Sequence, residues 1–248
     1  MQRKSTDYQS LLTQRGRSHW WAAGMRRVGW ALLGEARGRT LDIGCGPGWD
    51  LAELPGAAWR IGLDHDHRAV FFRPLVLGDA ARLPFEPGAC ALVLALDLLE
   101  QRGVAPPQVL AEVRRVLAPG GRVLIRVPAH PWLFGPHDRF WGGARRYRKQ
   151  ELATLVTGAG FTLRRLTYAN CVLFPLAAVG RLLARVTGRG GDDLWLLPGP
   201  VNRLLLGVLT LEARWLRRHD LPMGLSLLCL AEHGAHTANT QYPIPNTR

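Results

Sequence analysis

The chain has 248 residues, 47% of them hydrophobic, which is enough for one full-size α/β domain with a buried core. No stretch approaches ~20 uninterrupted apolar residues and the N-terminal residues are polar and basic, which argues against a spanning helix and a secretory signal. Four cysteines stand far apart without a CxxC pair, which argues against a zinc knuckle or a disulfide framework. We therefore expect a cytoplasmic protein.

The formal net charge is +13, and all but two of the 32 basic residues are arginines. A field of this sign would attract nucleic acid, anionic lipid or a phosphorylated substrate. The simpler interpretation, which we favour for most of them, is that the arginines solvate the surface. One segment stands apart, because 139–149 holds five basic residues and no acidic one.

From residue 39 onward, hydrophobic runs of strand length alternate with helix-like stretches, the pattern of a parallel sheet with crossover helices. Strands are predicted at 39–44, 59–64, 73–79, 91–97, 122–127, 161–168 and 225–233. Helices are predicted from the glycines at 44–48 through Ala52, from Pro106 to Leu117, and at 149–160. The run at 91–97 is almost wholly apolar, as expected for a central strand that is buried on both faces.

This alternation stops at 170–222, where two apolar stretches flank a break rich in glycine, aspartate and proline at 188–200. We interpret 170–222 as a helical insertion before the last strand. Residues 234–248 are polar, and we expect a disordered tail. The predicted organisation is therefore an N-terminal helical cap over 1–38, a main domain over 39–233 that includes the insertion, and the tail.

The most informative segment is a glycine-rich turn, in which a strand ends, Gly44, Gly46 and Gly48 alternate, and a helix begins. Glycines let the backbone turn tightly and let a ligand approach main-chain N–H groups. A dinucleotide fingerprint needs glycine where this chain has Trp49, and a P-loop needs a lysine after glycine, which is missing. Asp42 precedes the turn; its charge is unfavourable beside a pyrophosphate but suits a ligand with an amino group and a sulfonium.

Two further acids end strands. Asp64 follows Gly44 by twenty positions, where a carboxylate can accept both ribose hydroxyls. Asp79, with Ala80 after it, follows the third strand, where an adenine amino group could lie. Three strand-end acids in register point to one adenosine-containing ligand with positive charge; the alternative, ordinary loop and capping residues, needs three coincidences.

The segments LDIGCGPG, GDAARLPF and VLAEVRRVLAPGGRVLI resemble those of the class I SAM-dependent methyltransferases of the type 11 group, with a match over residues 39–168. The resemblance implies a doubly wound, Rossmann-like, mostly parallel α/β sheet of seven strands whose last strand is antiparallel. It also implies S-adenosyl-L-methionine (SAM) as the cofactor, bound by 39–233. The residues implied for it are Asp42, Gly44, Gly46 and Gly48 for the methionine part, Asp64 for the ribose, and Asp79 with Ala80 for the adenine. The predicted cofactor site further includes Cys45, His65 and Asp97.

The chain departs from related sequences at three places. Ala91 and Gln101 replace an acid and a histidine around the fourth strand, and Gly143 replaces a histidine before an Arg-Arg-Tyr motif. None of these changes removes a cofactor-binding acid. The loss of two histidines leaves fewer candidates for a general base, so a non-catalytic protein stays an alternative.

Methyl transfer from a sulfonium is an in-line displacement, so an enzyme mainly aligns acceptor, methyl and sulfur, and a nearby base helps a hydroxyl or carboxyl acceptor. Candidates near the fifth strand include His130, but we favour His137 beside Asp138 as the base. The predicted catalytic residues are His137, Asp138 and Tyr147, and the predicted substrate-binding residues are Arg145 and Arg146. The alternatives are a structural or solvated histidine and arginines that pair at the sheet edge. No metal is expected, because the cluster at 64–67 lies where the ribose should sit.

The insertion at 170–222 pairs leucine-rich runs with arginines. We rank a lid over a hydrophobic substrate first and peripheral contact with the inner face of a membrane second. The leading function is methyl transfer to O or N of a small or lipid-like acceptor of the secondary-metabolite type. An RNA methyltransferase and a non-catalytic SAM-fold binding or assembly protein are the alternatives; we do not expect a nucleic-acid partner, and the oligomeric state stays open.

Overall fold

The computed structural model describes residues 16–56, 59–66, 73–187 and 197–234. Within them, seven strands form one sheet in the order β3-β2-β1-β4-β5-β7-β6. The strands are β1 (Arg39–Ile43), β2 (Trp59–Asp64), β3 (Leu75–Leu77), β4 (Cys90–Leu96), β5 (Leu117–Pro128), β6 (Phe161–Ala169) and β7 (Ser226–His233). The first five pair in parallel, and β7 runs antiparallel to both neighbours, β5 and β6. This confirms the predicted fold class.

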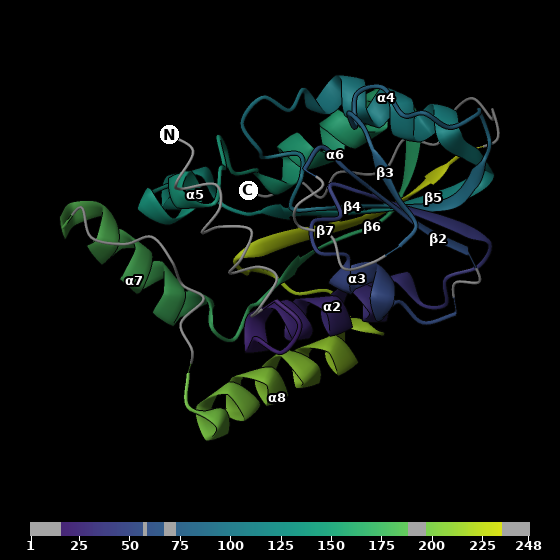
Figure 1. Ribbon diagram of the computed structural model, residues 1–248. Helices are drawn as coiled ribbons and strands as arrows, with labels where there is room; N and C mark the ends of the chain where they lie inside the picture. Colours follow the sequence, from purple (N-terminus) through teal and green to yellow (C-terminus); the bar gives the residue numbers. More distant parts are fainter. Residues whose placement is uncertain (1–15, 57–58, 67–72, 188–196, 235–248) are drawn as a thin grey trace.

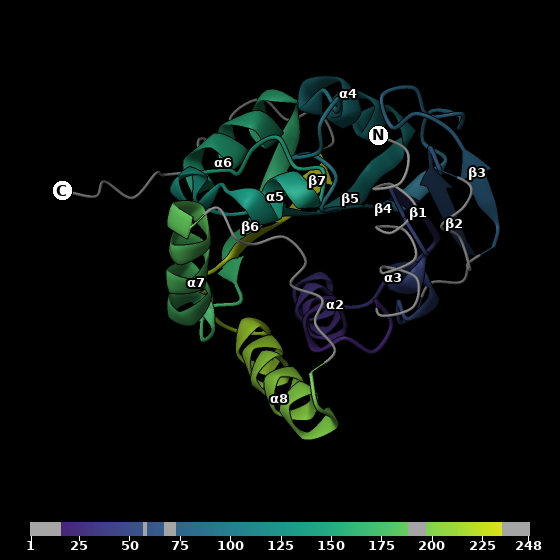
Figure 2. The same cartoon turned by 60° about the vertical axis from the view of Figure 1, so that its left-hand side comes forward.

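Helices cover both faces of the sheet (Figure 1). They are α2 (Trp20–Leu33), α3 (Trp49–Ala52), α4 (Pro106–Val116), η2 (Pro131–Leu133), α5 (Pro136–Phe140), α6 (Lys149–Gly158), α7 (Phe174–Thr187) and α8 (Gly199–Leu216). In Figures 1 and 2, α4 and α6 lie on one face, whereas α2 and α3 lie on the other, with α8 packed outside α2. The insertion therefore supplies α7 and α8, which lie between β6 and β7 in the chain.

The strand β4 shows why the sheet is buried on both faces. Side chains alternate along a strand, so Val93 and Ala95 enter the core beneath α4 and α6, while Leu92 and Leu94 enter the core beneath α2. At ~25 cal/mol per Å² of apolar surface, burying one such leucine stabilises the fold by roughly 2 kcal/mol before entropy is counted. The two cores fix the register of β4 in the centre of the sheet, as the apolar run predicted.

Most strand ends differ by one residue from those expected, and three elements differ by more. The third strand is shorter (Leu75–Leu77). The fifth is longer (Leu117–Pro128), because β5 begins directly after α4 ends at Val116 and runs through the Pro-Gly-Gly turn. The helix α6 ends at Gly158, where a hydrogen-bonded turn closed by Gly160 follows. The predicted cap over 1–38 is described only from residue 16, where it contains α2, and the tail predicted over 234–248 lies outside the described residues after 234.

None of the described helices is long and apolar enough to cross a bilayer. Nor do the described residues bring three His, Cys, Asp or Glu side chains together as a metal site would require. Of the cluster at 64–67, His67 lies outside the described residues.

Candidate cofactor and acceptor site

The candidate site lies where the carboxyl ends of β2, β1 and β4 stand side by side. In a doubly wound sheet the loops after such strands bind the ligand, at the point where the strand order reverses. Here the order reverses between β1 and β4, so the loop after β1 and the residues after β2 and β4 meet at one edge. This edge receives Gly44–Gly48, Asp64 and Asp97.

The loop after β1 needs its glycines. Gly44, Gly46 and Gly48 have φ of 71°, 50° and 80°, in the left-handed region that other residues rarely adopt. A Cβ added at Gly44 would lie 3.0 Å from Leu98 Cδ1, so tight space adds to the conformational preference for glycine. The N–H groups of Gly44 and Cys45 donate to the Leu63 carbonyl at 2.8 and 3.1 Å, which ties the loop to β2.

The carboxylate of Asp64 joins the two strand ends. It is buried, and its Oδ2 accepts from the Gly46 N–H at 2.8 Å while its Oδ1 accepts from Asp66 N at 2.9 Å. The exposed ring of His65 lies beside it, with Nδ1 3.3 Å from Oδ1. A carboxylate has about four lone-pair sites, so Asp64 can hold the loop and still accept from a further donor.

An excess of buried acid surrounds this loop. Burial, followed by the charge of Asp50, raises the pKa of Asp42 well above its usual range, although Arg126 opposes the shift. Burial also raises the pKa of Asp50, one of whose oxygens has no hydrogen-bond partner among the described residues. A cationic ligand would favour the ionised form of both carboxyls. The residues present therefore fit an amino group and a sulfonium better than a phosphate.

Arg126 is the buried cation of this edge, and the sequence reasoning missed it. It extends from β5 to Asp97, with Nε 2.9 Å and Nη2 2.7 Å from the same carboxylate oxygen. Its guanidinium lies over the Trp21 ring, 5.5 Å from the centroid, so α2 closes over the site. Asp97 has a left-handed φ of 56° immediately after β4. An arginine between apolar residues in the strand sequence VLIRV was the available signal.

Glu100 was also missed. It is buried, and burial followed by the charge of Asp97 raises its pKa well above the usual range. Its Oε2 has no hydrogen-bond partner among the described residues. A buried carboxyl of this kind beside the ends of β4 and β5 can hold a proton or meet a polar ligand atom.

Two further predicted cofactor residues lie after β3. Asp79 is exposed, and its Oδ1 accepts from Ala81 N at 2.9 Å, which holds the turn that carries Ala80. By contrast, the Cys45 thiol is buried, and burial together with the charge of Asp42 raises its pKa. The Cys45 side chain is therefore a neutral, packed part of the loop, and its contact with a cofactor stays a prediction.

Tyr147, Asp138 and Arg146, three of the predicted site residues, make contacts within the protein. Tyr147 is buried, its hydroxyl donates to the Leu99 carbonyl at 2.8 Å, and burial raises its pKa to about 12. Asp138 and Arg146 pair with each other at 2.7 Å, both nearly inaccessible to solvent. These three side chains hold the segment between β5 and α6 together. These contacts favour structural roles over the predicted catalytic and substrate-binding ones.

The other two candidates of this segment differ from them. His137 is half-buried on α5, with its ring centroid 6.3 Å from that of Trp141. Arg145 is exposed. Both stay predictions, His137 as a base and Arg145 as an anion-binding residue.

An aromatic cluster lies directly after β5, beneath α7. The His130 ring stacks on Tyr168 with centroids 5.3 Å apart and also contacts Trp132 and Phe174. Its Nε2 is buried with no hydrogen-bond partner among the described residues, and burial lowers its pKa. Aromatic side chains around a polar group are common in the lining of ligand sites.

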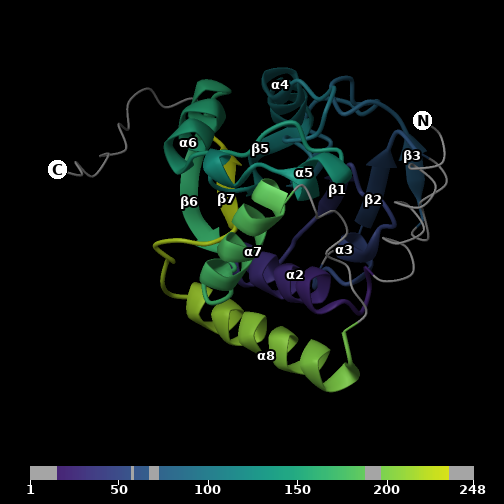
Figure 3. The same ribbon diagram turned by 90° about the vertical axis from the view of Figure 1, so that its left-hand side faces the viewer.

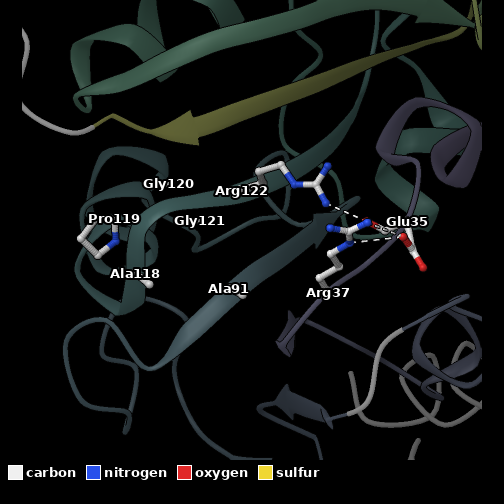
Figure 4. Close-up of a pocket in the computed structure, with 8 residues that line it drawn as sticks. All are labelled: Glu35, Arg37, Ala91, Ala118, Pro119, Gly120, Gly121 and Arg122. Atoms are coloured by element: carbon white, nitrogen blue, oxygen red, sulfur yellow. Dashed lines mark hydrogen bonds and ion pairs between the residues drawn. The ribbon is translucent and has the colours of Figure 1, made fainter.

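A hollow at the opposite end of the strands is lined by Glu35, Arg37, Ala91, Ala118, Pro119, Gly120, Gly121 and Arg122 (Figure 4). Its cations are already engaged, because Arg37 pairs with Glu35 and Arg122 donates to the carbonyls of Leu33 and Glu35. It lies at the amino ends of β4 and β5, far from the glycine loop along the strands. We therefore place the site at the carboxyl edge.

The glycine loop, the strand-end acids and the sheet order are similar to those of class I SAM-dependent methyltransferases. Residues 41–125 match the family model described as a methyltransferase domain. A 37.1 kDa protein encoded in a transposon of Streptomyces fradiae is 40% identical over 105 residues, 36% of this chain and 30% of that protein. A protein of Encephalitozoon cuniculi named as a methyltransferase is 34% identical over 92 residues, 36% of this chain and 44% of that protein. The matched segment thus spans less than half of either relative.

Solved structures share the fold at low sequence identity. A SAM-dependent methyltransferase of Thermotoga maritima superposes with a TM-score of 0.59 and 16% identity, covering 93% of this chain and 96% of that one. Geranyl diphosphate C-methyltransferase of Streptomyces coelicolor superposes with a TM-score of 0.53 and 14% identity, covering 84% and 79%. These likenesses extend the shared architecture beyond the segment that the family model matches.

Proposed function

We propose that this protein transfers the methyl group of SAM to an oxygen or nitrogen atom of a small or lipid-like acceptor. SAM supplies an electrophilic methyl group on a sulfonium. The observation that carries the proposal is the coincidence, at one sheet edge, of a glycine loop with buried carboxyls whose pKa values are raised. Such an edge favours a ligand that carries positive charge.

The chain's own residues divide the work of holding that ligand. In our proposal, Asp42, Asp97 and the glycine loop face the methionine part. Asp64 and His65 take the ribose hydroxyls, and the turn of Asp79 and Ala80 meets the adenine. Since Asp64 also fixes Gly46, ligand binding and loop geometry depend on the same carboxylate.

For the acceptor we propose the space beside the aromatic cluster of His130, Trp132, Tyr168 and Phe174. The side chains that surround it favour an apolar or aromatic acceptor. A lipid-like acceptor agrees with the fold neighbour that acts on geranyl diphosphate. Because burial lowers its pKa, the His130 imidazole is neutral at pH 7. Its Nε2 can therefore take up the proton that the methylated oxygen or nitrogen loses. His137 is the second candidate for this proton.

The test is transfer of labelled methyl from SAM to fractionated cell extract, with lipid, polar-metabolite and RNA fractions counted separately. The proposal expects label in the lipid or small-molecule fraction, lost in Asp64→Ala. His130→Gln should lower the rate and change its pH profile, whereas His137→Gln should leave both unchanged; the reverse would assign the proton to His137. Label confined to RNA, or no transfer by a protein that binds SAM, would contradict the proposal.

A further inference from the structure

The outward face of α8 is apolar and exposed. Leu204, Leu211 and Trp215 are 67%, 63% and 55% exposed. Their spacing of seven and four residues puts them on one side of the helix. The opposite side carries Leu209 and Leu216, which are buried against the rest of the protein. These three large apolar side chains form a continuous stripe along the helix, and no described element covers them. A stripe of this kind marks an interaction surface, whereas single exposed apolar residues do not.

A second apolar stripe follows α7. Leu176, Val179, Leu183 and Val186 recur at spacings of three, four and three, and all are exposed, Leu176 and Val186 most of all. The buried Ala178 marks the inner side of the helix, toward Leu133 and Leu225. Figure 3 shows α7 in front of the sheet and α8 below α2, so both helices lie at the periphery.

Arginines border the α8 stripe. Arg27 of α2, Arg203 and Arg214 line a shallow groove together with Leu204 and Leu211. In the described part of α7 and α8 the one acid is Glu212, which is buried and accepts backbone N–H groups of residues 170–172. We call Leu204, Leu211, Trp215, Arg203 and Arg214 the leucine–arginine surface. It is apolar at its centre and positively charged at its rim.

We infer that the leucine–arginine surface docks on an anionic membrane surface, with α8 lying in the plane of the interface. An interfacial helix buries an apolar stripe at the boundary of headgroups and acyl chains, while arginines extend to the phosphates. Tryptophan is favoured at that depth. A second copy of this chain would instead bring the same arginines together, without a described acid on the surface to pair with them. This inference goes beyond the proposed function and does not depend on cofactor binding.

The test is sedimentation of the full chain with vesicles of phosphatidylglycerol and phosphatidylcholine, against vesicles of phosphatidylcholine alone. The protein should bind the anionic vesicles, less as salt rises. Replacing both arginines (Arg203→Gln with Arg214→Gln) should weaken binding roughly 30-fold, since each arginine near an anionic surface contributes about fivefold. Replacing both leucines (Leu204→Gln with Leu211→Gln) should weaken it about tenfold or more.

The matched control is Arg102→Gln with Arg148→Gln, which removes the same charge from exposed positions outside the surface. It should change binding by less than about threefold, because charges farther than a Debye length are screened. Unchanged thermal unfolding of each variant shows that the fold is kept. Failure of the intact protein to bind anionic vesicles would overturn the inference. So would equal loss in the control, or a dimer that the leucine variants convert to a monomer.

Discussion

Removing the Arg146 side chain should lower the stability of the folded protein rather than weaken the binding of an anionic substrate. Its guanidinium lies 2.7 Å from Asp138, with side-chain exposures of 2% and 6%, and also donates to the Ala129 carbonyl at 3.0 Å. Removing one partner of such a pair costs about 3–5 kcal/mol, since the other charge stays buried. Asp138 keeps the Gly135 N–H at 2.9 Å and Arg181 at 4.0 Å. We therefore expect the lower end of that range for Arg146→Met.

A loss of about 3 kcal/mol would lower the melting temperature by roughly 6–12 °C for a chain of this size. Urea unfolding of Arg146→Met, Asp138→Asn and the double variant measures the loss and the coupling between the two residues. The control is Arg37→Met, which breaks an exposed pair with Glu35 and should cost less than about 1 kcal/mol. Full stability in Arg146→Met, with weaker binding of anionic acceptors, would refute the structural role and restore the substrate-binding prediction.

Three further predictions concern the loop, the histidine and the tyrosine. Gly44→Ala should weaken binding of S-adenosylhomocysteine at least about tenfold in calorimetry, because a positive φ and Leu98 both oppose a side chain; Gly180→Ala, in open space on α7, should leave binding unchanged. Burial lowers the pKa of His130 below its unfolded value near 6.5, so the unfolded chain binds the proton more readily and stability should fall as pH drops below about 6.5. Urea unfolding at about pH 7.5 and 5.5 should show a smaller pH dependence in His130→Phe; an unaltered dependence would mean that another group titrates. Tyr147→Phe should cost about 1 kcal/mol by loss of the bond to the Leu99 carbonyl, without moving the pH profile of methyl transfer; a moved profile would return this tyrosine to the catalytic candidates.

Local patterns were enough to predict the sheet. The apolar run at 91–97 and the glycine turn fix a buried central strand and a strand-to-helix loop, and the structure has both. The ends of strands were less predictable. Leu117 begins β5 because its pairing with Cys90 in β4 extends the strand through the turn, and pairing across distant residues leaves no mark in a local sequence window.

The same limit applies to the candidate site. Strand-end acids could be recognised one by one, but contacts between strands could not, so the pairing of Arg126 with Asp97 and the burial of Glu100 were missed. The internal contacts of Asp138, Arg146 and Tyr147 were missed for the same reason. Polar residues on a loop look available in sequence, whereas here the loop folds back and pairs them with one another and with Leu99.

The most direct measurement is titration of the purified protein with S-adenosylhomocysteine by calorimetry, beside Asp64→Ala, Asp64→Asn and Glu86→Ala. The account predicts micromolar binding that both Asp64 variants weaken at least about tenfold and that Glu86→Ala, an exposed acid away from the strand ends, leaves unchanged. Ligand at ~100 times the dissociation constant should also stabilise the folded state by about 2.7 kcal/mol. No binding by the intact protein, or equal binding by the Asp64 variants, would contradict the assignment of this edge as the cofactor site.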